Sequence, residues 1–211
     1  MGSKLEQEVK FYLSDISALE TKLIGLGATR VQPRSHEINL RFDTPDRRLS
    51  GRFQVLRLRQ DTRARLTYKG PSDPEREVSA REELEVEVSD LGTAHAILES
   101  LGFEVMVMYE KYRTAYLLDG VEISLDEMPF GTFCEVEGLD TESIQVIAEK
   151  LGLDWEARSK LSYLALFSMV KENLNLDFHN LDFKSFTGIE IHPKDFGMRA
   201  ADQGNQLLIE T

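Results

Sequence analysis

The chain has 211 residues, which is long enough for a sizeable hydrophobic core in a single domain. Hydrophobic residues make up 41% of it and charged residues 29%, and this composition excludes disorder over most of the chain. The 37 acidic and 25 basic residues give a net charge of −12, which argues against nucleic acid as a general electrostatic partner.

Two further features limit the class of protein. The one cysteine, Cys134, excludes an internal disulfide and a cysteine-based zinc site. No stretch approaches the roughly 20 apolar residues of a membrane span, and the first residues lack the apolar core of a secretion signal. We therefore expect a cytoplasmic protein.

Four segments have the apolar spacing of amphipathic helices. They are residues 14–26, 91–101, 141–151 and 163–173. The first three end in a leucine followed by a glycine, at Leu26, Leu101 and Leu151. This shared ending predicts the same kind of helix C-cap three times.

Between these helices, polar and apolar residues alternate, which predicts strands with two unlike faces. The strands are residues 5–11, 38–43, 56–59, 66–69, 81–88, 111–116, 121–126 and 133–137. None is apolar on both faces, which argues against a buried parallel sheet and favours antiparallel strands. The charged faces then either point to water from an open sheet or line the inside of a barrel.

The charges on these faces are grouped by sign. The basic ones are Arg57, Arg59, Lys69, Lys111 and Arg113, and the acidic ones are Glu6, Glu8, Glu83, Glu85, Glu87, Asp126, Glu135 and Glu137. Glutamates two residues apart on one strand lie roughly 7 Å apart, and converging pairs repel unless a cation bridges them. Carboxylate oxygens suit Mg²⁺ or Mn²⁺, and rows of Arg and Lys suit a chain of phosphates.

A series of short motifs follows the same order along the chain. They are Glu6-Gln7-Glu8-Val9-Lys10, Leu56-Arg57-Leu58-Arg59, Leu66-Thr67-Tyr68-Lys69-Gly70, Arg81-Glu82-Glu83-Leu84-Glu85, Glu110-Lys111-Tyr112-Arg113, Leu125-Asp126-Glu127, Phe133-Cys134-Glu135-Val136-Glu137-Gly138 and Ser159-Lys160-Leu161-Ser162-Tyr163. With them the chain resembles the CYTH superfamily, the triphosphate tunnel metalloenzymes, over about residues 5–170.

The resemblance implies an α+β fold: an eight-stranded antiparallel closed β-barrel that forms a triphosphate tunnel, with helices packed on the outside. The tunnel domain is expected at residues 1–170. Residues 171–211 are then a C-terminal extension of unknown role, either a tail packed on the barrel or a dimer arm or lid.

The resemblance also implies roles for individual residues. The implied metal ligands are Glu6, Glu8, Glu83, Glu85, Asp126, Glu135 and Glu137, and the implied triphosphate ligands are Lys10, Arg57, Arg59, Lys69, Lys111, Arg113 and Lys160. Glu6, Glu8 or Glu137 is expected to act as the catalytic base. Glu87 and Glu122 are expected in salt bridges at the rim, and Arg41 either adds a phosphate contact or projects at the tunnel mouth.

The implied activity is the hydrolysis of the terminal phosphoanhydride of a triphosphate, with Mg²⁺ or Mn²⁺ as cofactor. Candidate substrates are inorganic tripolyphosphate, ATP and thiamine triphosphate. The alternative is a class IV adenylyl cyclase that converts ATP to cyclic AMP and pyrophosphate, and a third is a non-catalytic polyphosphate-binding module. No sequence feature specifies an adenine pocket, so we favour hydrolysis. We expect no nucleic-acid or membrane partner. The sequence leaves open whether the protein forms a homodimer.

Overall fold

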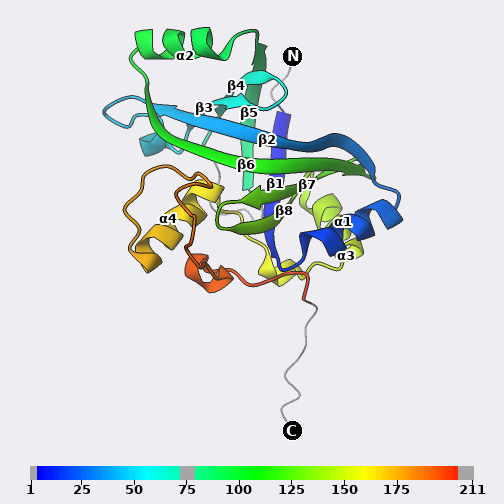
Figure 1. Cartoon of the computed structure of the whole chain (residues 1–211). Helices are drawn as coiled ribbons and strands as arrows, with labels where there is room; N and C mark the ends of the chain where they lie inside the picture. The colour runs from blue at the N-terminus through cyan, green and yellow to red at the C-terminus, as the bar shows by residue number, and fades with distance from the viewer. Residues whose placement is uncertain (1–3, 72–78, 204–211) are drawn as a thin grey trace.

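The computed structural model of the protein describes residues 4–71 and 79–203, and side chains within 7–71 and 81–203 (Figure 1). Its strands are β1 (Lys4–Leu13), β2 (Thr29–Asp43), β3 (Val55–Gln60), β4 (Ala64–Lys69), β5 (Ser79–Val88), β6 (Glu104–Leu118), β7 (Val121–Met128) and β8 (Gly131–Gly138). The α-helices are α1 (Ile16–Gly25), α2 (Leu91–Ser100), α3 (Thr141–Lys150) and α4 (Tyr163–Leu174). Short 3-10 turns lie at Ser50–Arg52, Trp155–Ala157 and Pro193–Phe196.

All neighbouring strands are antiparallel. Their order is β1-β5-β4-β3-β2-β6-β7-β8, and β1 pairs with β8 on one side and with β5 on the other, which is the order of a closed barrel. The β1–β5 pairing joins Lys4–Glu8 to Ser79–Glu83. The prediction of an α+β fold built on an eight-stranded antiparallel sheet is thus confirmed.

The two long strands β2 and β6 start well before the segments predicted at residues 38–43 and 111–116. Each has 15 residues, and the two pair with each other along most of their length. Their register shifts between Arg30 and Gln32 and again between Gln32 and Ser35. Such irregularities interrupt the alternation of polar and apolar residues, so the pattern did not reveal the first part of β2.

Helices cover the outer face of the sheet in two places. Helices α1 and α3 pack on β1, β7 and β8 over a core that includes Val9, Ile123 and Ile144, all fully buried. Helix α2 packs on β2 and β3 through Leu98, which contacts the cluster of Phe42 and Leu58. Figure 1 shows α2 at one end of the molecule, away from the other helices.

The predicted helix ends are also confirmed. Leu26, Leu101 and Leu151 are the C-caps, and each following glycine has a positive φ that an L side chain adopts only with strain. Cys134 is fully buried in the core under α1 and α3, and burial raises the pKa of its thiol.

The described part of the C-terminal extension packs on the barrel and on α4. Phe186 and Phe196 join an aromatic cluster with Phe133 and Tyr163. The Leu181 N–H donates to Met108 of β6, and the Glu110 N–H donates back to Leu181. The role of the extension as a tail, an arm or a lid stays a prediction. Across the described ranges we find no helix with the length and hydropathy needed to cross a membrane.

Candidate active site

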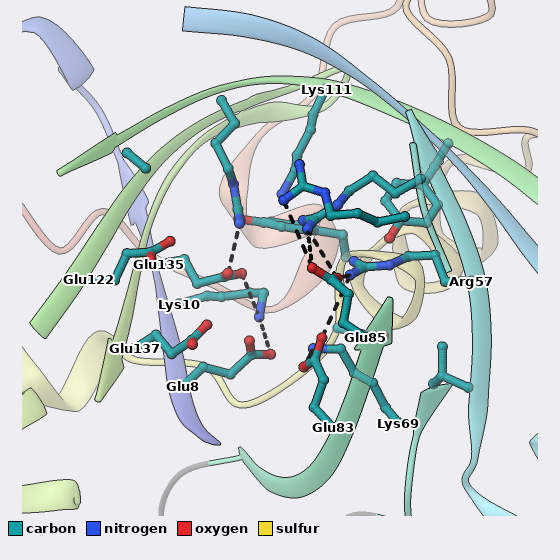
Figure 2. A pocket seen from close by; sticks show the side chains of 18 of the residues that line it. Glu8, Lys10, Arg57, Lys69, Glu83, Glu85, Lys111, Glu122, Glu135 and Glu137 are labelled. Atoms are coloured by element: carbon teal, nitrogen blue, oxygen red, sulfur yellow. Dashed lines mark hydrogen bonds and ion pairs between the residues drawn. The ribbon is translucent and has the colours of Figure 1, made fainter. Parts of the chain in front are cut away.

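The inner faces of the strands surround a charged cavity of about 410 Å³ (Figure 2). Among the described side chains, ten basic ones line it: Lys10, Arg41, Arg57, Arg59, Arg65, Lys69, Arg81, Lys111, Arg113 and Lys160. Six described glutamates line it as well: Glu8, Glu83, Glu85, Glu122, Glu135 and Glu137. The described lining therefore carries a net charge of +4 (10 − 6) inside a chain of net charge −12, which favours an anionic ligand.

One wall of the cavity carries a cluster of three carboxylates, Glu8 of β1 and Glu135 and Glu137 of β8. One oxygen from each lies within 4.8 Å of the others. The strand register causes this convergence, because Glu8 lies opposite Glu137 in the β1–β8 pair. Three hard oxygen donors so close together fit Mg²⁺ or Mn²⁺, which leave further coordination positions for phosphate oxygens and water.

Lys10 lies within this acidic wall and holds two of its members. Its Nζ is 2.9 Å from Glu8 Oε1 and 3.0 Å from Glu135 Oε2. Burial favours neutral carboxyl groups, but Lys10 outweighs it and lowers the pKa of Glu8. For Glu135, Lys10 and Arg113 together outweigh burial and hold the pKa well below its usual value. Both groups are therefore anionic at neutral pH, as metal ligands must be.

Asp126, a predicted metal ligand, lies below the cavity surface and outside the carboxylate cluster. It is fully buried, and its oxygens accept from Lys111 at 3.0 Å, from Arg113 at 2.6 Å and from Tyr163 at 2.7 Å. Asp126 therefore contacts Lys111 and Arg113, two of the predicted phosphate ligands, and helps to fix the positions of their side chains. Its role as a metal ligand stays a prediction.

Glu83 and Glu85, also predicted as metal ligands, lie on the opposite wall with the basic residues (Figure 2). Lys69 Nζ is 2.5 Å from Glu83 Oε2, and Arg59 is 3.2 Å from Glu85 Oε2. Arg57 lies 3.9 Å from both carboxylates. These two glutamates are thus arranged as partners of Lys and Arg and do not join the cluster around Glu8.

The basic wall holds more positive charge than its carboxylates compensate. The Nε atoms of Arg57, Arg59 and Arg65 are buried without a hydrogen-bond partner. Burial, reinforced by the neighbouring Arg57, lowers the pKa of Arg59. Basic side chains outnumber acidic ones in the described lining, and this excess favours an anion as the ligand.

Glu37 was missed by the sequence analysis, although it lies beneath this wall. It is 1% exposed, with Lys111 at 3.8 Å and Arg59 at 3.7 Å. Burial opposes its charge, but Lys111, Arg113 and Arg59 outweigh this and lower the pKa of its carboxyl strongly. Glu37 lies four residues before Arg41 and therefore on the same face of the strand. Extending the predicted strand by one residue would have found it.

The sequence analysis also missed Arg65 and Tyr163 as lining residues. Arg65 lies on β4 two residues before Thr67 and four before Lys69, so its side chain is on the same inward face as that of Lys69. Tyr163 is the first residue of α4, and no strand pattern marks it.

The remaining predicted residues lie at the edges of the site. Glu87 pairs with Arg63 at 3.3 Å, an exposed rim salt bridge as expected, whereas Glu122 lines the cavity next to Glu137. Lys160 lines the cavity. The backbone of Glu6 lies on β1 opposite Arg81, but its side chain lies outside the described residues.

The fold and this site define a barrel protein with a charged internal cavity, and comparison with known proteins agrees. The model of the CYTH domain family matches residues 4–160. The chain therefore belongs to the CYTH family.

Three proteins illustrate what the chain is similar to. It is 28% identical to a Methanocaldococcus jannaschii protein with a provisional adenylate cyclase name, over 81% of this chain and 93% of that one. It is 27% identical to adenylate cyclase CyaB of Aeromonas hydrophila, over 77% of this chain and 88% of that one. A solved structure from Hippeastrum superposes with a TM-score of 0.58 at 22% identity, over 77% of this chain and 95% of that one.

Proposed function

We propose that this protein hydrolyses the terminal phosphoanhydride of a triphosphate inside its barrel, with Mg²⁺ or Mn²⁺ as cofactor. One observation carries the proposal. Three carboxylates within 4.8 Å of one another face, across one cavity, a basic wall whose buried Arg57, Arg59 and Arg65 Nε atoms lack acceptors. A cation site opposite an anion site is what a metal-assisted phosphoryl transfer requires.

In this proposal the basic residues hold the phosphates extended across the cavity. Arg57, Arg59 and Lys69 of β3 and β4 act from one side, and Lys10, Lys111 and Arg113 act from β1 and β6, with Lys160 at the α4 end. Arginine binds phosphate through two parallel hydrogen bonds, and lysine adds a compact positive charge.

The carboxylate cluster would hold the cation. Bound there, a divalent ion would supply charge neutralisation for the phosphates and lower the pKa of water. The lowered pKa values of Glu8 and Glu135 suit ligands. Glu137, the third member of the cluster, is then our candidate for the base that takes a proton from the attacking water, a role for which Glu6 and Glu8 remain alternatives.

The named relatives favour a second function, the adenylate cyclase reaction of CyaB. It would use the same frame, with the ribose 3′-hydroxyl in place of water as the nucleophile. We favour hydrolysis because the lining offers little platform for a purine. Its two tyrosines, Tyr109 and Tyr163, are only 8% and 6% exposed. The Hippeastrum protein is described as an adenylyl cyclase with a dominant triphosphatase activity, so both reactions are attributed to this fold.

We also propose that residues 1–170 form the catalytic unit and that the described part of the extension, up to residue 203, supports α4 from outside. The short β1–β5 pairing would keep the barrel closed around the substrate. The extension contacts β6 through Leu181, and Asp202 accepts from the N–H groups of Ser14 and Asp15.

Product analysis tests the function directly. The purified protein is incubated with tripolyphosphate, thiamine triphosphate or ATP, each in Mg²⁺ and in Mn²⁺, and the products are separated by ion-exchange chromatography. We expect orthophosphate, released fastest from tripolyphosphate. Cyclic AMP with pyrophosphate from ATP would instead establish the cyclase, and binding without turnover would establish the polyphosphate-binding module.

A further inference from the structure

Glu37 is a buried carboxylate to which the proposed function gives no task. Its side chain is 1% exposed, and it is not among the described residues that line the cavity. It lies on β2, which separates β3 from β6 in the order of the barrel, and it is directly opposite Lys111 of β6. Glu37 is therefore placed between two strands that carry proposed phosphate ligands, and it acts on a bound phosphate through their side chains.

The Glu37 carboxylate pairs with one proposed phosphate ligand from each neighbouring strand. Arg59 Nη1 of β3 is 3.7 Å from Oε2, and Lys111 Nζ of β6 is 3.8 Å from Oε1. Among the described side chains, no other carboxylate forms ion pairs with both strands. Asp126 pairs on β6 alone, and the glutamates of β5 pair on β3 and β4.

A second residue of β2 fixes the Glu37 side chain. Asn39 is fully buried, and its Nδ2 donates to Glu37 Oε1 at 2.9 Å. Asn39 also lies directly opposite Arg59 of β3. The negative charge of Glu37 is thereby held between Arg59 and Lys111, two like charges that repel each other when no anion lies between them.

This position has two opposite consequences for a bound anion. The charge of Glu37 attracts Arg59 and Lys111, so it holds their side chains at a fixed spacing before the anion arrives. The same charge repels the phosphates that these side chains bind, and in a buried site this repulsion is only weakly screened. Glu37 thus improves the alignment of the phosphate ligands and weakens the binding of the phosphates.

We propose that Glu37 is a positioning residue, the built-in counter-ion that aligns Arg59 of β3 with Lys111 of β6 for the reaction and lowers the affinity of the cavity for the anion. This inference rests on the proposed function, because it concerns the phosphate ligands of the same cavity.

Three variants separate the two effects. Glu37→Gln keeps the size of the side chain and removes its charge, whereas Glu37→Asp keeps the charge and moves the carboxylate back by one methylene. Glu127→Gln is the matched control, since Glu127 is 35% exposed, pairs with Arg34 and is not among the described lining residues. Titration calorimetry in EDTA measures the Kd of tripolyphosphate, and orthophosphate release with Mg²⁺ measures kcat.

The expected result is a split between affinity and rate. In Glu37→Gln, Kd should fall about tenfold because a repelling charge is gone, and kcat should also fall about tenfold because Arg59 and Lys111 are less well aligned. In Glu37→Asp, Kd should stay within about twofold of the wild type, since the charge is kept, while kcat falls. Glu127→Gln should change neither value.

Weaker binding together with a lower kcat in Glu37→Gln would overturn the inference, because Glu37 would then only stabilise the fold. Tighter binding with an unchanged kcat would overturn it as well. If Glu37→Gln does not fold, Glu37→Asp decides the matter, and a wild-type kcat in that variant contradicts the role in alignment. The calorimetric comparison needs no turnover, so an unchanged or higher Kd in Glu37→Gln refutes this inference even if the protein makes cyclic AMP and the proposed hydrolysis fails.

Discussion

The two walls of the cavity differ in how far each compensates its own charge. On the acidic wall, Lys10 lies 2.9 to 3.0 Å from two of the three clustered carboxylates. On the basic wall, three guanidinium Nε atoms have no acceptor, and the carboxylates Glu83 and Glu85 are shared among Lys69, Arg57 and Arg59. On the acidic wall Lys10 therefore bridges two of the three carboxylates, whereas on the basic wall three guanidinium Nε atoms have no acceptor although carboxylates lie nearby.

The difference indicates an order of binding. An anion gains contacts on the basic wall at once, because the donors are already fixed by β3, β4 and β6. A cation must compete with Lys10 for Glu8 and Glu135 until phosphate oxygens add to its ligands. We therefore expect the anion to bind well alone and the cation to bind best with it, and the predictions below test this from the largest effect to the smallest.

The largest effect is expected from the acidic wall during turnover. Glu8→Gln keeps the shape of the side chain but removes one negative charge from the cluster of three carboxylates. We expect kcat for tripolyphosphate with Mg²⁺ to fall about 10³-fold, as when one charge-stabilising group is removed from an active site. Steady-state orthophosphate release measures it.

Glu87→Gln is the control for this substitution. Glu87 is 52% exposed and pairs with Arg63 at the rim, where ion pairs contribute little. Its kcat should stay within twofold of the wild type, roughly the effect of losing one surface pair. Equal losses in both variants would show that the cluster around Glu8 has no special role.

The second effect is ligand stabilisation, and it compares the walls directly. Because basic side chains outnumber acidic ones in the described lining of the cavity, tripolyphosphate in EDTA should raise Tm by about 5 °C at 100 times its Kd. Mg²⁺ alone should raise Tm by less than half of this, because Lys10 already occupies the acidic wall. Differential scanning calorimetry checks both, and a larger shift from Mg²⁺ alone would reverse the comparison.

The alternation pattern predicted which side chains point inward, but not which of them contact one another. Glu83 and Glu85 have the same two-residue spacing as Glu135 and Glu137, and the sequence treats the pairs alike. Their environments differ because the register places Lys69 opposite Glu83 but Glu8 opposite Glu137. Register depends on the pairing of distant segments, which a local pattern does not contain.

Glu37 and Tyr163 were missed for two other reasons. Glu37 precedes the predicted strand because register shifts between Arg30 and Ser35, near the start of β2, interrupt the alternation there. Tyr163 enters the cavity from the first turn of α4, so its position follows from how the helix packs on the barrel and from no period-two pattern. The fold and the charged face were therefore predictable, whereas the contacts within the site were not.

The third prediction concerns the pH dependence of stability and tests whether Asp43 anchors the turn after β2, where it accepts from the N–H groups of Thr44, Leu49 and Ser50. Burial raises the pKa of Asp43, but hydrogen bonds from Ser50, Leu49 and Thr44 outweigh it and lower the pKa from 3.8 to about 2. Because the folded pKa is lower than the unfolded one, Asp43 stabilises the fold above pH 3.8 and this contribution is lost as the pH falls toward 2.

Asp43→Asn should therefore lower the free energy of unfolding at pH 7 by about 2 kcal/mol and flatten its decrease in acid. Urea denaturation at several pH values measures this. The control is Asp46→Asn in the same turn, whose side chain is 58% exposed and pairs only with its neighbours. If Asp43→Asn left the acid profile unchanged, Asp43 would not anchor this turn in the way that its hydrogen bonds indicate.

The smallest effect is expected at Tyr163, which contacts residues of both walls. Its ring centroid is 5.2 Å from Lys10 Nζ and 5.2 Å from Lys111 Nζ, and its hydroxyl donates to Asp126 at 2.7 Å. Tyr163→Phe removes the hydrogen bond but keeps the ring. We expect a loss of about 1 kcal/mol in the free energy of unfolding, since Lys111 and Arg113 still satisfy Asp126.

Tyr163→Leu removes the ring as well and should loosen both lysines. If the acidic wall depends on Lys10 as we infer, this variant should bind Mg²⁺ more tightly than Tyr163→Phe does, because a less constrained Lys10 competes less for Glu8 and Glu135. It should bind tripolyphosphate more weakly, because Lys111 is then less well placed. Titration calorimetry with each ligand alone measures both changes, and parallel losses of the two affinities would mean that Tyr163 only stabilises the fold and does not balance the two walls.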